Sequence, residues 1–287
     1  MKVKVCLVFT AIVAVCAAPA RAAILYSTPN ANYLQNFDSL PSTPENVSLG
    51  ASPIGWTDDN AAPGVGNFSI VGFYLYHVTA QAEGGFSGKQ RMRIGAGTAN
   101  TGAFMSNGVS GSTDRAFGSL ASNTTAAVAD GGVQYLGARL TNNTGVNLAN
   151  FTLSYDGEQW RDGGAATPVA QQLVFEWKVA AANIQDTGFT AASGLNFSSP
   201  VFVNTGAGAA VVGNTAGLVA KGPTTVNGIG WAPGTDLWLR WTDANDSGND
   251  HGLAIDSLVF SANVPEPGSL CLFAVAALVG LSRTRRG

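Results

Sequence analysis

The densest group of oxygen-bearing side chains in the sequence is an acidic loop at residues 243–252. It reads Asp-Ala-Asn-Asp-Ser-Gly-Asn-Asp-His-Gly, and a further carboxylate follows four positions later. Carboxylate and amide oxygens at every second or third position, with a glycine for a sharp turn, are what a hard cation such as Ca²⁺ requires. The sequence therefore predicts calcium ligands at Asp243, Asn245, Asp246, Asp250 and Asp256.

The start of this loop resembles an EF-hand, with Gly248 at the sixth position. Ala254, however, stands at the twelfth position, where an EF-hand needs a bidentate glutamate. An EF-hand is therefore excluded, and an irregular calcium loop stays open as the one cofactor site that the sequence suggests. The other interpretation is a turn without an ion, because Asn and Asp side chains accept hydrogen bonds from their own backbone.

A second group of polar residues, at 155–164, surrounds Trp160. Two carboxylates beside a tryptophan are compatible with a sugar site or a glycosidase acid/base pair. The Glu-x-Asp-x-x-Glu motif of the jelly-roll glycosidases is absent, and Glu158 and Arg161 are equally suited to a structural ion pair. His77 and His251 come without a Gly-x-Ser-x-Gly elbow that would present a nucleophile. We therefore expect no enzymatic activity.

Short alternating apolar runs supply the elements that must position these groups. The three clearest runs are 151–155, 173–179 and 237–242, and each has the period of a strand with one face on a core. In the last run, Trp238, Arg240 and Thr242 are expected to face water. Further strands are expected at 68–78, 91–94, 133–140, 201–204 and 253–260. The pattern predicts an all-β fold, an antiparallel β-sandwich, with a bulge near Asp256 and Ser257 where the apolar phase of the last strand shifts.

The composition indicates one β-sandwich domain at residues 23–263. Cys6, Cys16 and Cys271 all lie outside it, so no disulfide and no cysteine-ligated metal are expected. Six of the fifteen basic residues and one of the eighteen acids also belong to the two ends, which leaves nine basic and seventeen acidic residues and a net charge of −8. Nucleic acid is therefore not an expected partner.

The first 22 residues have the form of a secretory signal. Lys2 and Lys4 precede an apolar run, and the small residues Ala20 and Ala22 fit cleavage by signal peptidase after Ala22. The alternative is a buried N-terminal helix. A lipoprotein signal is disfavoured, because Val15 precedes Cys16 where a small residue is needed.

The other end, residues 264–287, carries three features in order. These are Pro265-Glu266-Pro267, twelve mostly apolar residues at 270–281, and a basic cluster of Arg283, Arg285 and Arg286. Twelve helical residues span about 18 Å, short of a hydrocarbon core of about 30 Å. The arginines favour the cytoplasmic side. The segment is expected to be a short hydrophobic helix that holds the chain in the inner membrane transiently; an ordinary C-terminal anchor is the alternative.

The tripeptide, apolar run and arginine cluster together resemble the PEP-CTERM sorting signal of Gram-negative bacteria. The resemblance implies that an exosortase, a membrane-embedded cysteine transpeptidase, processes this end during export to the cell surface or the medium. It covers about the last 24 residues and implies nothing about the preceding domain.

A second resemblance concerns the fold. Residues 37–41 (Phe-Asp-Ser-Leu-Pro) and 253–258 (Leu-Ala-Ile-Asp-Ser-Leu) are similar to the paired terminal strands of MAM-like and concanavalin-like jelly rolls. It implies a jelly-roll-like sandwich whose two terminal strands lie together.

The expected function is that of an exported cell-envelope or extracellular-matrix protein with a non-enzymatic β-sandwich. A lectin-like module for extracellular polysaccharide is the alternative, favoured by the acidic composition and by Trp238 as an expected exposed aromatic. A secreted hydrolase is the third interpretation.

Overall fold

The computed structural model describes residues 23–42, 70–77, 92–123, 126, 128, 132–203 and 206–264. These segments form two β-sheets and a 3₁₀ turn, η2 (Ser193–Leu195), and they contain no α-helix. No helix in this part of the chain is long and apolar enough to cross a membrane. The expected signal helix at 1–22 and the hydrophobic helix after residue 264 lie outside the described residues, as do the sorting residues Pro265 to Arg286 and the cleavage residues Ala20 and Ala22.

The first sheet, sheet A, has the order β1-β7-β14-β9-β10, with β3 also paired to β7 and β11 to β9. Its strands are β1 (Ile24–Tyr26), β3 (Phe73–His77), β7 (Val133–Asn142), β9 (Gln172–Val179), β10 (Thr190–Ala191), β11 (Phe197–Ser198) and β14 (Asp236–Ala244).

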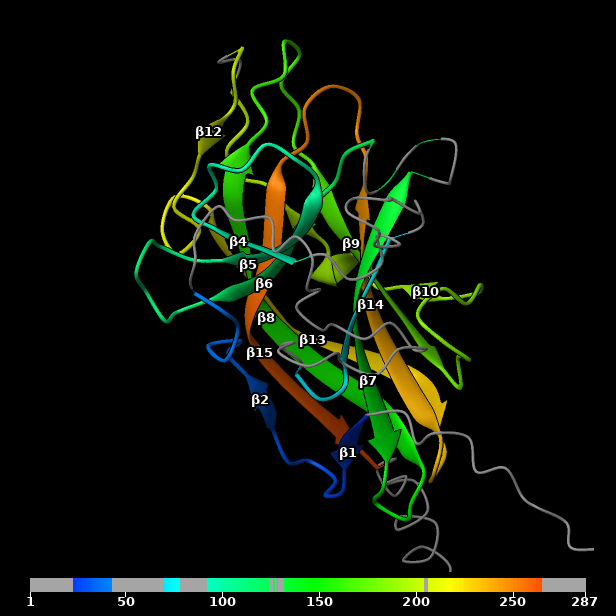
Figure 1. Cartoon of the computed structure of the whole chain (residues 1–287). Helices are drawn as coiled ribbons and strands as arrows, with labels where there is room; N and C mark the ends of the chain where they lie inside the picture. The colour runs from blue at the N-terminus through cyan, green and yellow to red at the C-terminus, as the bar shows by residue number, and fades with distance from the viewer. Residues whose placement is uncertain are drawn as a thin grey trace, which may run out of the picture.

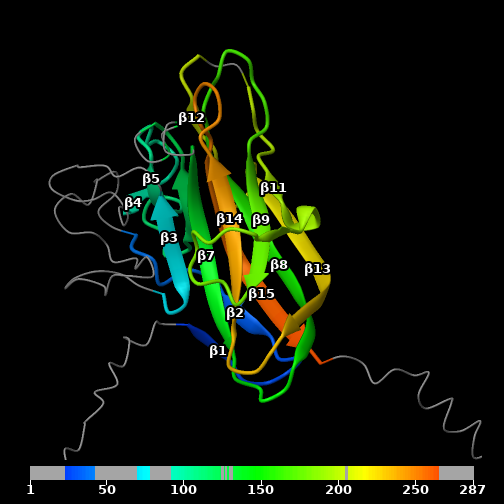
Figure 2. The same ribbon diagram turned by 90° about the vertical axis from the view of Figure 1, so that its right-hand side faces the viewer.

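The second sheet, sheet B, has the order β12-β8-β15-β6-β5-β4, with β13 also paired to β8 and β2 to β15. Its strands are β2 (Tyr33–Gln35), β4 (Met92–Gly95), β5 (Ala103–Asn107), β6 (Ala116–Leu120), β8 (Leu148–Asp162), β12 (Ala209–Ala210), β13 (Leu218–Trp231) and β15 (Gly252–Asn263). Figures 1 and 2 show the two sheets as layers of one sandwich.

The pairing confirms the predicted all-β sandwich of jelly-roll-like type. Every strand pair is antiparallel in the described segments except β1 with β7 and β4 with β5, which are parallel. A pair of strands from the two ends of the domain does form, but β2 rather than residues 37–41 supplies the first strand, which pairs with the end of β15 from Gln35–Leu258 to Tyr33–Phe260. Phe37, just after β2, stacks on Phe117 of β6 with ring centroids 5.2 Å apart.

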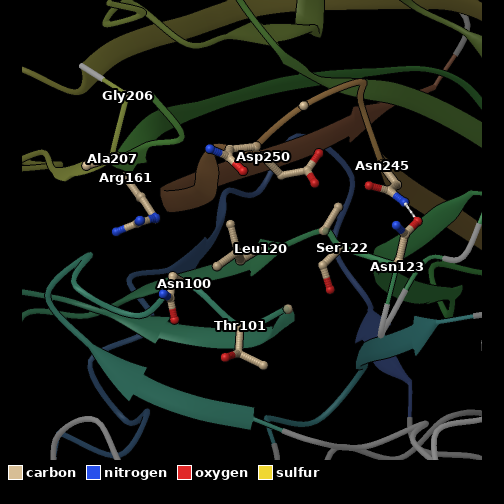
Figure 3. A pocket seen from close by; sticks show the side chains of 14 residues that line it. Asn100, Thr101, Leu120, Ser122, Asn123, Arg161, Gly206, Ala207, Asn245 and Asp250 are labelled. Carbon is tan, nitrogen blue, oxygen red and sulfur yellow. Dashed lines mark hydrogen bonds between the residues drawn. The ribbon is translucent and has the colours of Figure 1, made fainter. Parts of the chain in front are cut away.

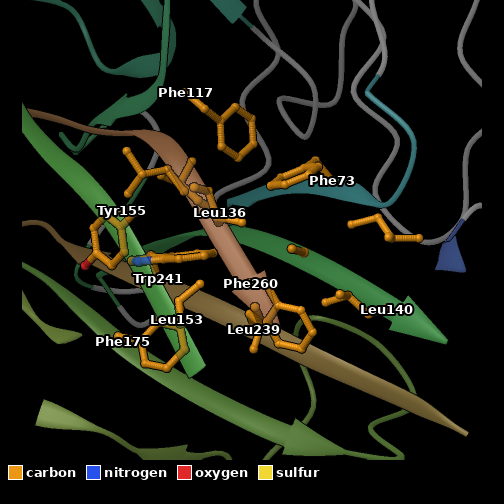
Figure 4. Close-up of a cluster of buried hydrophobic side chains, with 14 of the residues drawn as sticks. Phe73, Phe117, Leu136, Leu140, Leu153, Tyr155, Phe175, Leu239, Trp241 and Phe260 are labelled. Atoms are coloured by element: carbon orange, nitrogen blue, oxygen red, sulfur yellow. The ribbon is translucent and has the colours of Figure 1, made fainter. Parts of the chain in front are cut away.

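The core lies between the sheets and contains the predicted inward faces of the strands. Phe151, Leu153 and Tyr155 of β8 are buried against Leu239 and Trp241 of β14 and their neighbours (Figure 4). The rings of Tyr155 and Trp241 are perpendicular, and their centroids lie 5.6 Å apart. Burial of large aromatic side chains dominates the stability of such a core, at roughly 25 cal/mol for each Å² removed from water.

The prediction for the other face of β14 was wrong. Trp238 is 0% exposed and Arg240 7% exposed, where both were expected to face water. The segment between β9 and β10 folds over this face, so Trp238 packs with Ile184 and the Arg240 guanidinium lies 3.7 Å from the ring centre of Phe189. Trp238 is therefore not an exposed aromatic for a sugar to stack on.

The predicted bulge in the last strand is confirmed. The register of β15 against β8 shifts between Asp256 and Val259, and Ser257 has φ of 49°. The extra residue lets Ile255 and Leu258 both enter the core. It leaves Asp256 on the opposite side of the strand from them.

Candidate functional site

A polar pocket of about 580 Å³ opens at one end of the sandwich. Five separate segments form it: the turn before β5, the end of β6, Arg161 of β8, the residues before β12 and the loop between β14 and β15. Figure 3 shows Arg161 at one side of the pocket and Asn123 with Asn245 at the other. The lining residues are Asn100, Thr101, Gly102, Leu120, Ala121, Ser122, Asn123, Arg161, Gly206, Ala207, Asn245, Gly248, Asn249 and Asp250.

The predicted calcium loop supplies one wall of this pocket. Asn245 and Asp250 line it directly, whereas Asp243 lies behind them in β14, where it is 3% exposed. One carboxylate oxygen of Asp243 accepts hydrogen bonds from Ser119 Oγ (2.7 Å) and Gln134 Nε2 (3.1 Å). Burial raises the pKa of Asp243 to about 7 in spite of these bonds.

Asn245 connects the loop to the end of β6. Its amide nitrogen donates to Asn123 Oδ1 at 2.8 Å and to the carbonyl of Ala126 at 2.9 Å. Because these bonds engage the amide nitrogen of Asn245, its position in the wall is fixed before any ligand arrives.

Asp250 closes the loop through a hydrogen bond between its side chain and the backbone four residues earlier. Its Oδ1 accepts the backbone N–H of Asp246 at 2.8 Å, which is the ion-free arrangement considered from the sequence. Burial, and then the nearby charges of Asp243 and Asp246, raise the pKa of Asp250 to about 8. Asp250 is therefore largely protonated at neutral pH, when it donates as well as accepts hydrogen bonds.

Asp256, the fifth predicted ligand, belongs to a different group of acids. Burial and the charges of Glu158, Asp114 and Asp38 raise its pKa to about 8. Its Oδ1 is buried without a hydrogen-bond partner. Glu158, in the neighbouring strand, accepts the Trp160 indole N–H at 2.8 Å and has a pKa of about 7, raised mainly by burial. The alternative ion pair of Glu158 with Arg161 does not form.

The structure thus separates the predicted ligands. Asn245 and Asp250 line the pocket, Asp243 is buried behind them, and Asp256 lies with Glu158 in a different group of acids. Within the described residues, no three His, Cys, Asp or Glu side chains form a group that could hold a metal ion. Calcium binding by the loop stays a prediction.

Sequence reasoning missed a buried network beside the pocket. His251 lies 3.0 Å from Ser199 Oγ through Nδ1 and 3.3 Å from Asp162 Oδ1 through Nε2. This is the residue set of a Ser-His-Asp hydrolase, but each of the three is 2% exposed, which keeps Ser199 away from a substrate. Ser199 is 52 positions from His251, and no local motif marks it.

The chemistry of the pocket is hydrogen bonding. Four asparagines, a threonine and a serine line it, so the wall contains both donors and acceptors, although Asn245 and Asn123 use part of their amides in the bond between them. Leu120 is the one large apolar side chain among the lining residues, and none of them is aromatic. Such a wall fits a ligand that is itself rich in hydroxyl groups.

Comparison with known proteins identifies the C-terminal segment. Residues 263–286 match the PEP-CTERM protein-sorting motif, which confirms the resemblance drawn from Pro265-Glu266-Pro267 and the terminal arginines. The chain therefore carries a sorting signal of this type, which implies processing by an exosortase and export to the cell surface or the medium.

The preceding domain has more distant likenesses. Among solved structures it is similar to the CBM22-1 xylan-binding domain from Paenibacillus barcinonensis Xyn10C, at 10% sequence identity and a TM-score of 0.28, over 57% of this chain and 82% of that chain. A TM-score this low establishes neither a shared site nor a shared ligand. No curated protein matches the chain.

Proposed function

We propose that this chain is a non-enzymatic cell-envelope or matrix protein that binds extracellular polysaccharide in the pocket between Arg161 and the 245–250 loop. The observation that carries the proposal is the pocket wall, in which amide, hydroxyl and carboxyl groups from five segments converge around about 580 Å³. That volume suits one or two sugar rings, since ligand pockets typically measure about 300–1,000 Å³.

Binding without turnover is favoured by the placement of the carboxylates. Glycoside hydrolysis needs two carboxyl groups that flank the scissile bond. Asp250 is the one carboxylate among the lining residues, and Glu158 and Asp256 belong to another group. The pocket therefore has hydrogen-bonding groups for a sugar but lacks a second lining acid to cleave it.

The route to the site of action is part of the proposal. Signal peptidase removes residues 1–22 after general secretion, the C-terminal helix holds the chain briefly in the inner membrane, and exosortase then processes this end. The domain would thus reach the polysaccharide layer outside the cell.

The proposal is tested with the exported protein on a glycan array, followed by calorimetric titration of the best ligands. Asn100→Ala with Thr101→Ala should weaken binding, because both side chains line the pocket and neither belongs to the hydrophobic core. Asn227→Ala, on the exposed part of β13, should leave binding unchanged. Absence of glycan binding, or an equal loss in the Asn227 variant, would contradict the proposal. If a bound glycan is converted into shorter products, the protein is a hydrolase and the non-enzymatic part of the proposal is wrong.

A further inference from the structure

The guanidinium of Arg161 is the cation of the pocket. Arg161 lies near the end of β8, where its backbone pairs with Gly252 of β15 and Ala210 of β12. Its side chain is half-buried and extends along one wall of the pocket (Figure 3).

One glycine makes room for this side chain, and a second glycine accepts its hydrogen bond. Gly208 has φ of +61°, and a Cβ built there would lie 2.6 Å from Arg161 Nη2. Gly97 has φ of +83°, its carbonyl accepts a hydrogen bond from Arg161 Nη1 at 3.2 Å, and a Cβ there would overlap the Trp160 carbonyl. Both backbones adopt a conformation that L-residues with a side chain rarely take. The local fold is therefore built around the guanidinium.

No carboxylate of the described residues lies within 4.0 Å of Arg161, and Gly97 accepts its one side-chain hydrogen bond there. Two other buried arginines differ, since Arg139 pairs with Asp236 at 2.6 Å and Arg240 with Glu176 at 2.8 Å. The adjacent Asp162 is directed elsewhere, to His251 and to the backbone N–H of Val203. A guanidinium has five N–H donors, so most of those on Arg161 stay available to a ligand.

Resting on the proposed function, we infer that the polysaccharide is acidic and that Arg161 binds the carboxylate of a uronic-acid residue. The planar fork of a guanidinium matches a carboxylate through two parallel hydrogen bonds. The neighbouring amides of Asn100 and Asn249 then hold hydroxyl groups of the same chain.

The electrostatics of the pocket support an anionic ligand. Burial lowers the pKa of Arg161, with Asp162 as the opposing influence, so the half-buried cation is incompletely compensated by the protein.

The test compares oligosaccharides of equal length that are neutral, uronate-containing or sulfated, titrated into the exported protein with a chelator present throughout. The chelator removes calcium as a bridge between carboxylates. Arg161→Gln should weaken uronate binding about 10- to 100-fold, the range for a charged hydrogen bond, and should weaken neutral binding by much less. Arg161→Lys should lose less, because it keeps the charge but not the fork. Lys221→Gln, on β13 outside the pocket, should match the unaltered protein.

Each outcome decides between the proposals. Equal uronate and neutral binding, unaffected by Arg161→Gln, would overturn the acidic ligand and leave polysaccharide binding intact. Preference for the sulfated chain over the uronate would overturn the carboxylate assignment. If the unaltered protein binds none of the three oligosaccharides, that result would instead contradict the proposed function. A melting curve of each variant establishes that it is folded. If Arg161→Gln does not fold, the comparison is made with Arg161→Lys instead.

Discussion

The imidazole of His251 lies 3.0 Å from the hydroxyl of Ser199, and this contact joins the start of β15 to the segment after β11. Ser199 Oγ accepts the backbone N–H of Gln171 at 3.0 Å, so its own proton is directed to His251 Nδ1. On the opposite side, Asp162 accepts from Nε2 at 3.3 Å. These partners favour the neutral ring with its proton on Nε2, and they fix the base of the loop that carries Asp250.

The first prediction concerns the acid stability of this network. Burial lowers the pKa of His251, with Asp162 and Asp246 as the opposing charges, so the unfolded chain takes up a proton at higher pH than the folded chain. The stabilisation is complete above about pH 6.5 and falls as the pH decreases below it, by at most about 1.4 kcal/mol per pH unit. The difference in unfolding free energy between the protein and His251→Gln should therefore shrink from pH 7 to pH 5. A constant difference would show that protonation of His251 is not linked to folding.

The second prediction has the opposite sign and concerns Asp256. Its pKa of about 8 means that the folded state holds a proton that the unfolded state loses near pH 4. Stability from this site is therefore present at low pH and is lost as the pH rises from about 4 to about 8. Asp256→Asn imitates the protonated acid, so denaturant unfolding should find this variant more stable than the unaltered protein at pH 8 and nearly equal at about pH 4. Equal destabilisation at both pH values would contradict the prediction.

Local alternation in the sequence predicted the sandwich because one face of each strand meets the core. Phe151, Leu153 and Tyr155 show this on β8, and the phase shift around Ser257 identified the bulge. Burial of Trp238 was not predictable in this way, since it depends on the chain around Ile184 folding over β14. A period-two pattern describes neighbours along a strand and not a distant segment that covers it.

The candidate site was predictable in part for the same reason. The 243–252 loop is dense in carboxylates and amides, which makes it recognisable in the sequence, and four of its residues line the pocket: Asn245, Gly248, Asn249 and Asp250. Arg161 reaches the same pocket from a strand that pairs with β15, through contacts that sequence spacing does not encode. Asp256 was grouped with the loop because it is near in sequence, whereas the bulge directs it to the Asp114 and Glu158 group.

The third prediction concerns sorting. Residues 263–286 match the PEP-CTERM motif, and we expect the exosortase to recognise Pro265-Glu266-Pro267 within it. Replacing these three residues with alanines should retain the protein in the inner membrane, while the unaltered protein reaches the surface or the medium without its C-terminal helix. Cell fractionation and intact-mass measurement test both statements. Exported protein with an intact C-terminus through Gly287 would contradict them.

The fourth prediction concerns calcium at the pocket loop. An ion bound at Asp250 would offset the burial, and the smaller repulsion from Asp243 and Asp246, that raise the pKa of this carboxyl. At about 100 times the dissociation constant it would stabilise the fold by about 2.7 kcal/mol, and roughly 2–4 °C of melting temperature accompanies each kcal/mol. Calcium at about 5–10 mM, the upper range of extracellular sites, should therefore raise the melting temperature by several degrees over chelator, and more at pH 8.5 than at pH 6. Asp250→Asn should abolish the shift, whereas Asp256→Asn, in the other group of acids, should retain it. Identical curves with calcium and chelator would leave the hydrogen bond from the Asp246 N–H to Asp250, without an ion, as the account of this loop.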